Sequence, residues 1–375
     1  MKRERLSNFE LMRITSMFFI VVYHFIVDTG GKLISHTSGL ANIILIFLSL
    51  IIIVHVNSFV MVTGYFQYDK KCSLKKVLSM IAMVWFYSAT IALIFHLTGM
   101  KEFTTLETLK ILSPFEYENL WFFKTYIALY LLSPYINILI KNLNQKQHRN
   151  LLILLTVMYS IISTITYQQT FGNTGFSIVH FIYLYMLGAY LRKYPIKENN
   201  HFKNYSEKKK FLIFISIFLF MGTFNFLLYE FADNLLKINF GNTINYICKL
   251  IKENLYYYQN PILLIQSIAY FLMFETVNFK SKIINKISSC VFAIYVITEN
   301  INIRNKMYKW LGFYTGKIIY GNKIILKIFI YSIAVFVICI LIELTRKLIR
   351  NIIYKFINKY KETKKLNENI TTKTC

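Results

Sequence analysis

Long apolar runs recur along the whole chain, and short polar connections separate them. A helix that crosses the hydrocarbon core of a bilayer needs about 20 predominantly apolar residues, and the runs come close to that length. The pattern therefore predicts an all-α, polytopic integral membrane bundle of about ten transmembrane helices. The expected spans lie at residues 9–28, 40–66, 77–97, 120–140, 151–167, 176–192, 211–229, 261–279, 288–303 and 325–345.

The composition agrees with a bilayer as the solvent. Hydrophobic residues make up 55% of the 375 residues and charged residues only 16%, which leaves too little polar surface for a soluble particle. The formal charge of +25 comes from Lys and Arg in short connections, so topology explains it and no nucleic-acid partner is expected. The cysteines form no CxxC pair, so neither a disulfide framework nor a metal site is predicted.

The connections predict the orientation of the bundle. Those after the second, fourth, sixth and eighth spans are basic, which predicts that both termini are cytoplasmic. The abundance of Ile, Lys, Asn, Tyr and Phe suggests a bacterial source, so the expected location is a bacterial plasma membrane. The connection 304–323 is an exception, because it is basic and would be external. Either it meets an anionic acceptor outside, or the ninth and tenth spans are misassigned. We divide the chain into a transmembrane domain, 1–345, and a basic amphipathic cytoplasmic tail, 346–375, on anionic lipids.

The first span carries ionisable residues, which are costly inside a bilayer and normally mark function. Arg13 and His24 are eleven residues apart, about three helical turns, so they share one face about 16 Å apart along the axis. Glu10 and Asp28 lie on the same stripe. One edge of this helix therefore presents a cation at its cytoplasmic end and an imidazole near its outer end.

Two interpretations of this edge remain open. In the chemical one, His24 is a general base for a hydroxyl group and Asp28 holds its tautomer. Arg13, together with Lys71, Lys75 and Lys76, would then bind a phosphorylated cofactor that enters from the cytoplasm. In the structural one, Arg13 snorkels to the inner headgroups and His24 is a packed histidine bonded to a neighbouring helix.

At this spacing the sequence resembles the membrane-bound acyltransferase family 3, whose first helix carries Arg or Lys, ten residues, and then His. Here these two positions are Arg13 and His24. The resemblance continues in order through nearly the whole chain. Its other segments are HVNSFVMVTGYF, the pair Lys75–Lys76, NLWFFKTYIALYLLSPYIN and CVFAIYVITENINIR.

The resemblance implies an O-acyltransferase that takes an acyl group, expected to be acetyl, from acyl-CoA on the cytoplasmic side. The acceptor would be a hydroxyl of a surface polysaccharide or lipid-linked glycan, with other polysaccharide-biosynthesis enzymes as partners. His24 carries over as the catalytic histidine and Arg13 as a donor-binding residue. Direct attack and an acyl-imidazole intermediate both remain open.

The chain departs from the family pattern at three positions. The basic RxxR before the third span is reduced to Lys75 and Lys76 followed by Ser79. The histidine of the family's YLIH segment is Thr298, so no second catalytic histidine is expected there. The histidine of the His-x-Trp that opens the fourth span is Asn119, which is polar but does not titrate.

Four further polar or aromatic residues are candidates. Glu299, at a depth comparable to His24, either orients the imidazole or is a solvated rim carboxylate. Asn119, Trp121 and Tyr126 are candidate acceptor-binding residues, since aromatic rings stack on sugars. An aromatic belt at the membrane interface explains Trp121 and Tyr126 equally well.

A transporter or flippase of glycan intermediates is the alternative function, with the polar edge lining a conduit. It predicts internal repeats and helices broken by Gly or Pro, whereas the chain holds only 13 Gly and 4 Pro. A membrane glycan polymerase ranks last, because the 230–260 connection contains no Arg.

Overall fold

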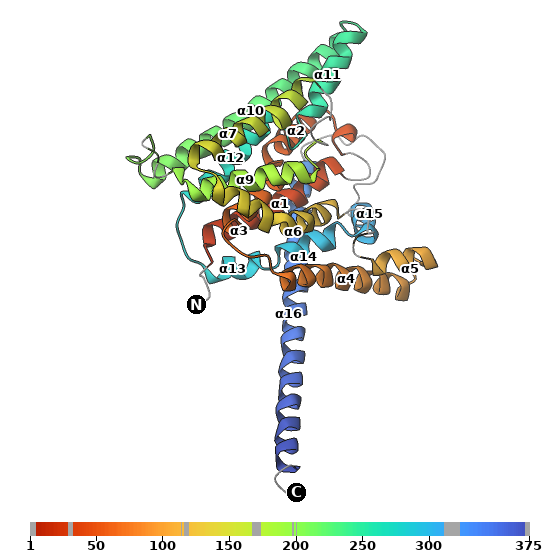
Figure 1. The fold of residues 1–375 in the computed structure, drawn as a ribbon. Coiled ribbons are helices and arrows are strands. Elements are labelled where there is room, and N and C mark those ends of the chain that lie inside the picture. The colour runs from red at the N-terminus through yellow and green to blue at the C-terminus, as the bar shows by residue number, and fades with distance from the viewer. Residues whose placement is uncertain are drawn as a thin grey trace.

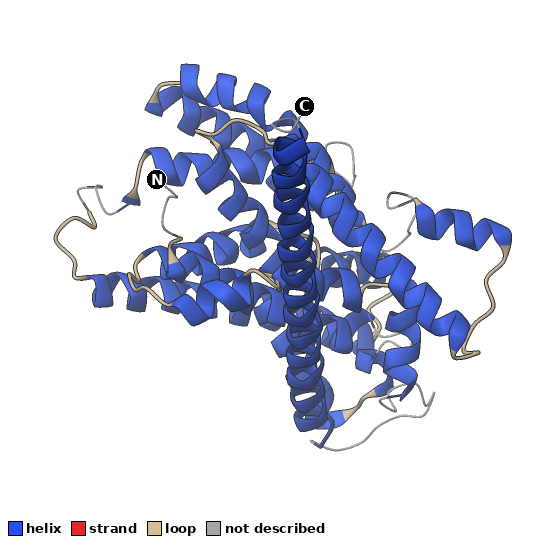
Figure 2. Cartoon of the chain, turned by 90° about the horizontal axis from the view of Figure 1, so that it is seen from below, coloured by secondary structure: helices blue, strands red, loops and turns tan. Residues whose placement is uncertain are grey.

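The computed structural model describes residues 5–28, 33–113, 115, 120–166, 174–196, 199, 201–310 and 323–371. Within these ranges the regular structure is helical, and no β-strand occurs (Figure 2). The all-α prediction is therefore confirmed for the part of the chain that the structure describes. The helices are α1 (Ser7–Tyr23), η1 (His24–Asp28), η2 (Leu33–His36), α2 (Gly39–Ile52), α3 (His55–Gln67), α4 (Leu74–Leu97), α5 (Thr105–Leu112), α6 (Trp121–Asn142), α7 (Gln145–Leu155), η3 (Thr156–Ile162), α8 (Ser163–Thr166), α9 (Ile178–Lys193), α10 (Glu207–Ile238), α11 (Asn242–Asn254), α12 (Pro261–Glu275), α13 (Lys282–Ser288), α14 (Val291–Thr298), α15 (Ile301–Trp310) and α16 (Lys323–Thr371).

Seven helical segments among the described residues are long and apolar enough to cross a membrane. The other three predicted spans fall on shorter helices, since α9 has 16 residues, α12 has 15 and α14 has 8. The seven long segments are Ser7–Val27, Gly39–Gln67, Leu74–Leu97, Trp121–Asn142, Gln145–Thr166, Glu207–Ile238 and Lys323–Asn358.

Several helix starts follow directly from local sequence. The side chain of the residue before the helix accepts a hydrogen bond from a first-turn N–H group, which satisfies a donor that the helix itself leaves unpaired. Proline stands at the first position of α12, where its missing N–H costs nothing. The capping residues are Thr104, Asn144, Ser177, Ser206, Asn260 and Ser281.

The predicted span 288–303 is not one helix, which corrects the sequence-based boundary. The chain ends α14 at Thr298, passes through Glu299 and Asn300, and begins α15 at Ile301. Asn300 explains the break, because its side chain accepts a hydrogen bond from the N–H of Asn302 at 3.0 Å and caps the new helix. Hydrophobic periodicity cannot reveal such a break, since the apolar run continues across it.

The helices α1, α3 and α9 lie in the middle of the bundle (Figure 1). The helix α10 packs against α11 and α12 along one edge, and α6 packs on α9. The helix α1 contacts α3, α12, α13, α14 and α16, so it joins the central helices to the C-terminal ones. The candidate site is therefore built around α1, with residues from nearby helices and connections.

The helices α3 and α9 approach so closely that their backbones touch. A Cβ atom built on Gly64 would lie 2.0 Å from the carbonyl oxygen of Tyr185, and one built on Gly188 would lie 2.0 Å from that of Met61. Small residues at facing positions allow this approach, which maximises packing between helices in a membrane. The two glycines therefore fix the separation of the central pair.

We expect Gly64→Ala to lower the free energy of unfolding by about 1–3 kcal/mol, because the added methyl group meets backbone atoms that cannot move aside. Gly222→Ala is the control, since its Cβ would meet the side-chain ends of Ile51 and Gln266 rather than backbone atoms. Thermal unfolding in detergent measures both variants. Equal stability of the two variants would contradict the backbone contact.

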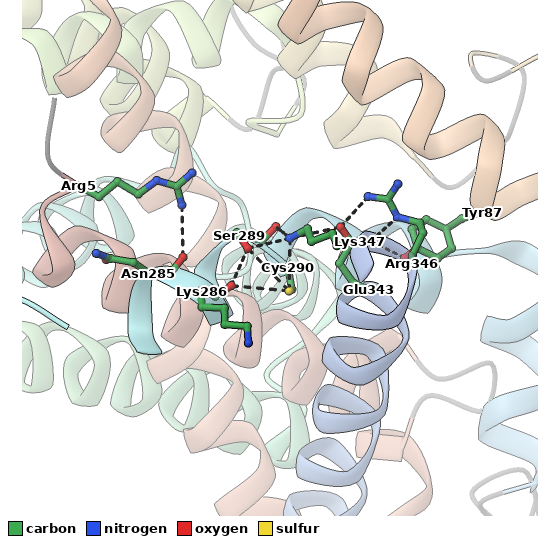
Figure 3. Close-up of polar contacts among 9 residues, drawn as sticks. All are labelled: Arg5, Tyr87, Asn285, Lys286, Ser289, Cys290, Glu343, Arg346 and Lys347. Atoms are coloured by element: carbon green, nitrogen blue, oxygen red, sulfur yellow. Dashed lines mark hydrogen bonds and ion pairs between the residues drawn. The ribbon is translucent and has the colours of Figure 1, made fainter. Parts of the chain in front are cut away.

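The long helix α16 projects beyond the other helices and is anchored near its middle by a buried carboxylate (Figures 1 and 3). Glu343 is 0% exposed and accepts from the Tyr87 hydroxyl at 2.6 Å and from Arg346 at 2.6 and 2.7 Å. Lys347 lies 3.4 Å from the same carboxylate and donates to the carbonyl oxygen of Ser289 at 2.8 Å. This network ties α16 to α4 and to the start of α14.

We expect Glu343→Gln to destabilise the protein by about 1.5–3 kcal/mol, because hydrogen bonds to a charged acceptor become bonds to a neutral one. Glu207→Gln is the control. Its carboxylate is 65% exposed and lies 3.7 Å from Lys210, so about 0–1 kcal/mol is expected. Chemical or thermal unfolding in detergent measures the stability of both variants. An effect at Glu343 as small as that at Glu207 would show that the network does not hold α16.

Candidate functional site

His24 and Glu299 meet at one end of α1. The ring nitrogen Nδ1 of His24 lies 2.7 Å from Oε1 of Glu299, and Nη1 of Arg304 lies 3.2 Å from Oε2 of the same carboxylate. The Glu299 side chain is 5% exposed and that of His24 is 16% exposed. A buried carboxylate is thus held between an imidazole and a guanidinium, while the imidazole itself stays partly exposed.

Local structure positions both partners. The helix α1 changes at His24 into the π-helical turn η1, and such turns are frequent at functional sites. Glu299 stands in the break between α14 and α15, where the chain bends and its carboxylate turns toward α1. Arg304 follows within the first turns of α15 and returns to the same carboxylate. The sequence indicated the depth of these residues but neither the π-turn nor the break.

The contact between His24 and Glu299 suits general-base chemistry. A carboxylate beside Nδ1 favours the tautomer that leaves the lone pair on Nε2, and Nε2 can then take a proton. The contact is short, but its angle lies outside that of a well-formed hydrogen bond. Catalytic hydrogen bonds are often poorly aligned without substrate and tighten when it binds.

Asp28 is the other carboxylate that the sequence predicts beside His24. The backbone of Asp28 belongs to η1, but its side chain lies outside the described part of the structure. The structure describes a contact of His24 with the carboxylate of Glu299. Of the two carboxylates predicted to serve His24, Glu299 is the one for which the structure gives a geometry.

A cavity of about 410 Å³ lies near the start of α1 and is strongly cationic. Its described lining contains a single carboxylate, Glu10, which pairs with Arg13 at 2.9 Å and also accepts from the hydroxyl of Ser288. An excess of guanidinium and ammonium groups around one cavity favours an anion with several oxygens, such as a phosphate group. The basic lining residues are Arg5, Arg13, Lys70, Lys76 and Arg192.

The predicted donor-binding residues divide between this cavity and the surface. Arg13 and Lys76 line the cationic cavity, whereas Lys71 and Lys75 are exposed and are not part of its lining. Sequence reasoning missed Arg5, Lys70 and Arg192. They come from three separate segments that meet only in the fold, although each is a basic residue at the predicted cytoplasmic end of an apolar run.

The cations are held by aromatic rings and hydroxyl groups. Arg192 donates to the Tyr65 hydroxyl at 3.3 Å and lies 5.0 Å from the centre of its ring. The ammonium group of Lys76 lies 4.4 Å from the ring centre of Tyr130. Such contacts orient a cation without neutralising it, so its charge remains available to a ligand.

The residues predicted to bind an acceptor do not gather at one place. Tyr126 lines the cationic cavity, where its hydroxyl lies 3.4 Å from that of Thr63. Trp121 belongs instead to an aromatic cluster, with ring centres 4.5 Å from Phe176 and 6.1 Å from Tyr258. Asn119 lies outside the described residues.

Arg13 and His24 occupy separate places along α1. Arg13 lines the cationic cavity, and His24 meets Glu299 about three turns, or about 16 Å, further along the helix. Within the described ranges, no group of three His, Cys, Asp or Glu residues is arranged to hold a metal ion. The described site therefore consists of a cationic cavity at one end of α1 and an imidazole–carboxylate pair toward the other.

Comparison with known proteins identifies one family for this chain. A family model described as an acyltransferase domain matches residues 6–344, which is most of the chain. No curated protein and no solved structure in the comparison matches it. The matched range includes α1, the lining of the cationic cavity except Arg5, and the break between α14 and α15.

Proposed function

The chain belongs to acyltransferase family 3, and from this premise we propose that it is an integral membrane O-acyltransferase that transfers acetyl from acetyl-CoA to a glycan hydroxyl. One observation carries the proposal. The helix α1 joins a cavity suited to phosphate groups, at Arg13, to an imidazole–carboxylate pair suited to activating a hydroxyl, at His24. A two-substrate transfer needs both features, and they must be held at a fixed separation.

The donor half of the proposal rests on charge. Coenzyme A carries phosphate groups at one end and its thioester at the other. We assign the phosphate end to Arg5, Arg13, Lys70, Lys76 and Arg192, which line the cationic cavity. The thioester would then extend along α1 toward His24. Entry of the donor from the cytoplasm is part of the proposal and follows from the basic connections at this end.

The acceptor half rests on the His24–Glu299 pair. Nε2 of His24 takes the proton of an acceptor hydroxyl, and Glu299 and Arg304 balance the charge that develops on the imidazole. The same nitrogen would serve in an acyl-imidazole route. We assign the acceptor to a surface polysaccharide or lipid-linked glycan at a bacterial plasma membrane, made by neighbouring polysaccharide-biosynthesis enzymes.

We expect His24→Gln to lower acetyl transfer by about 10²–10⁴-fold, because the base is lost while the side chain keeps its polarity. Glu299→Gln should lower kcat with little change in KM, because it keeps the shape of the side chain and removes the charge that supports the imidazolium ion. His96→Gln is the control, since this histidine is exposed at the end of α4. The assay measures incorporation of label from radioactive acetyl-CoA into isolated membranes. Unchanged incorporation in the His24 variant would refute its role as the base.

The cationic cavity gives a second prediction. We expect Arg192→Ala to raise the KM for acetyl-CoA by about 10- to 100-fold, since a charge-assisted hydrogen bond contributes about 1.5–3 kcal/mol. The KM for acetyl-pantetheine, which lacks the phosphate groups, should not change. Lys141→Ala is the control, because Lys141 is exposed at the end of α6 and does not line the cavity. An equal effect on both donors would remove the phosphate assignment.

The function as a whole is tested in cells. Surface polysaccharide isolated from cells with the protein should carry O-acetyl groups that are absent without it and with the His24→Gln variant. Identical acetylation in all three preparations, together with no turnover of acetyl-CoA by isolated membranes, would overturn the proposed function.

A further inference from the structure

A second cavity, of about 890 Å³, lies between α4 and α16 and is separate from the cationic cavity. The helix α14 packs against both α4 and α16, and α15 packs against α4. Ile297 of α14 and Ile303 of α15 line the cavity, so its wall includes the two helices that flank the break at Asn300. The cavity is a groove at the edge of the bundle, beside the point where α16 begins to project (Figure 1).

Most of the groove lining is apolar, and many of these side chains are exposed. Ile94 is 50% exposed, Leu341 58% and Ile353 51%. The segment Lys323–Asn358 of α16 is apolar enough to cross a membrane, so its exposed side chains are suited to lipid rather than water. Exposed apolar surfaces that are larger than single side chains mark protein or membrane interaction sites. The shape and chemistry of this wall suit a hydrocarbon chain.

The groove also has a cationic part. Arg346 and Arg350 line it one turn apart on α16, and its described lining contains no Asp or Glu. Arg346 donates from Nε and Nη2 to the buried carboxylate of Glu343, which fixes its guanidinium group (Figure 3). Arg350 is exposed, and no described carboxylate pairs with it. The positive charge of Arg350 is therefore available to an anion that lies in the groove.

We propose that the groove between α4 and α16 binds an anionic phospholipid, with a hydrocarbon chain along the apolar wall and the phosphate group on Arg350. Guanidinium groups match the geometry of phosphate oxygens, and basic pockets between membrane helices bind anionic lipid headgroups. The sequence predicts that this end of α16 is cytoplasmic, and the cytoplasmic leaflet is the one that carries anionic lipids.

Charge disfavours a second copy of α16 as the occupant of the groove. The projecting part of α16 presents Arg350 and Lys355, which are both exposed. A second α16 in the groove would bring these cations against Arg346 and Arg350 of the first, and like charges that face each other weaken an interface. A phosphate group supplies the opposite charge instead.

The position of the groove gives the lipid a structural role. Ile297 precedes Glu299 by two residues, and Ile303 is followed directly by Arg304. A chain packed against Ile297 and Ile303 would support the two helix ends that hold the Glu299–Arg304 ion pair. Binding of the lipid is independent of acyl transfer, so it can be tested without an activity assay.

The test measures thermal unfolding of the purified full chain in a neutral detergent with increasing amounts of phosphatidylglycerol. We expect this lipid to raise the unfolding temperature, whereas phosphatidylcholine and glycerol phosphate, which lack the negative charge or the chains, have little effect. Arg350→Gln should raise the half-maximal concentration of phosphatidylglycerol by about 10- to 100-fold, because a charge-assisted hydrogen bond is lost. Arg149→Gln is the matched control, since Arg149 is exposed on α7 and does not line the groove.

A second pair of variants tests the apolar wall. Ile342→Trp places a bulky ring in the groove and should also weaken the response to phosphatidylglycerol. Ile338→Trp is its control, because Ile338 lies one turn away on α16 and does not line the groove. Both positions are exposed, at 43% and 54%, so the native fold can accommodate either ring.

The proposal is supported only if the protein responds to phosphatidylglycerol, Arg350→Gln and Ile342→Trp weaken the response, and the two controls keep it. An equal response to phosphatidylcholine, or to glycerol phosphate alone, would overturn it, because the site would then recognise only a chain or only a phosphate. An unchanged response in either groove variant would overturn it as well, since the lipid would then bind elsewhere.

Discussion

The burial of Glu299 is the constraint on which the rest of the site depends. An ionised carboxylate inside a membrane bundle is expensive unless positive or polar groups surround it. Here Arg304 at 3.2 Å supplies a full charge, and His24 at 2.7 Å supplies an imidazole whose protonated form the carboxylate stabilises. The break between α14 and α15 is what allows Glu299 to reach both partners, because an unbroken helix would carry Arg304 away from the carboxylate.

The site has two chemically different regions along α1, a cationic cavity and an imidazole–carboxylate pair. Near Arg13 the described groups are mostly cationic, and their single carboxylate, Glu10, is already paired. Toward His24 the groups are an imidazole and a carboxylate that is also paired with a guanidinium, which suit proton transfer. A helix has a fixed rise per residue, so it holds the two regions at a constant distance without needing any other element as a spacer.

The sequence was sufficient for the all-helical class and for placing Arg13 and His24 on one helical segment, because hydrophobic run length and an eleven-residue spacing are local properties. It also identified Glu299 by its depth in the ninth apolar run. It did not identify Arg5, Lys70 or Arg192 as one group, since these residues meet only through tertiary contacts.

Two features of the backbone also escaped prediction. The π-helical turn at His24 and the break at Asn300 leave the apolar pattern unchanged, and periodicity carries no signal for either. Tyr126 shows the same limit for side chains. Its aromatic character suggested a sugar contact, but the fold places it among the cations of the cavity.

The contact of Gly64 with the Tyr185 carbonyl and of Gly188 with the Met61 carbonyl has a mechanical consequence. Backbones that touch at reciprocal positions can neither slide past each other nor twist apart without losing that fit. The pair α3–α9 therefore resists deformation, and any motion that widens the bundle has to occur in helices outside this pair. The central pair would then serve as the fixed frame against which the outer helices move.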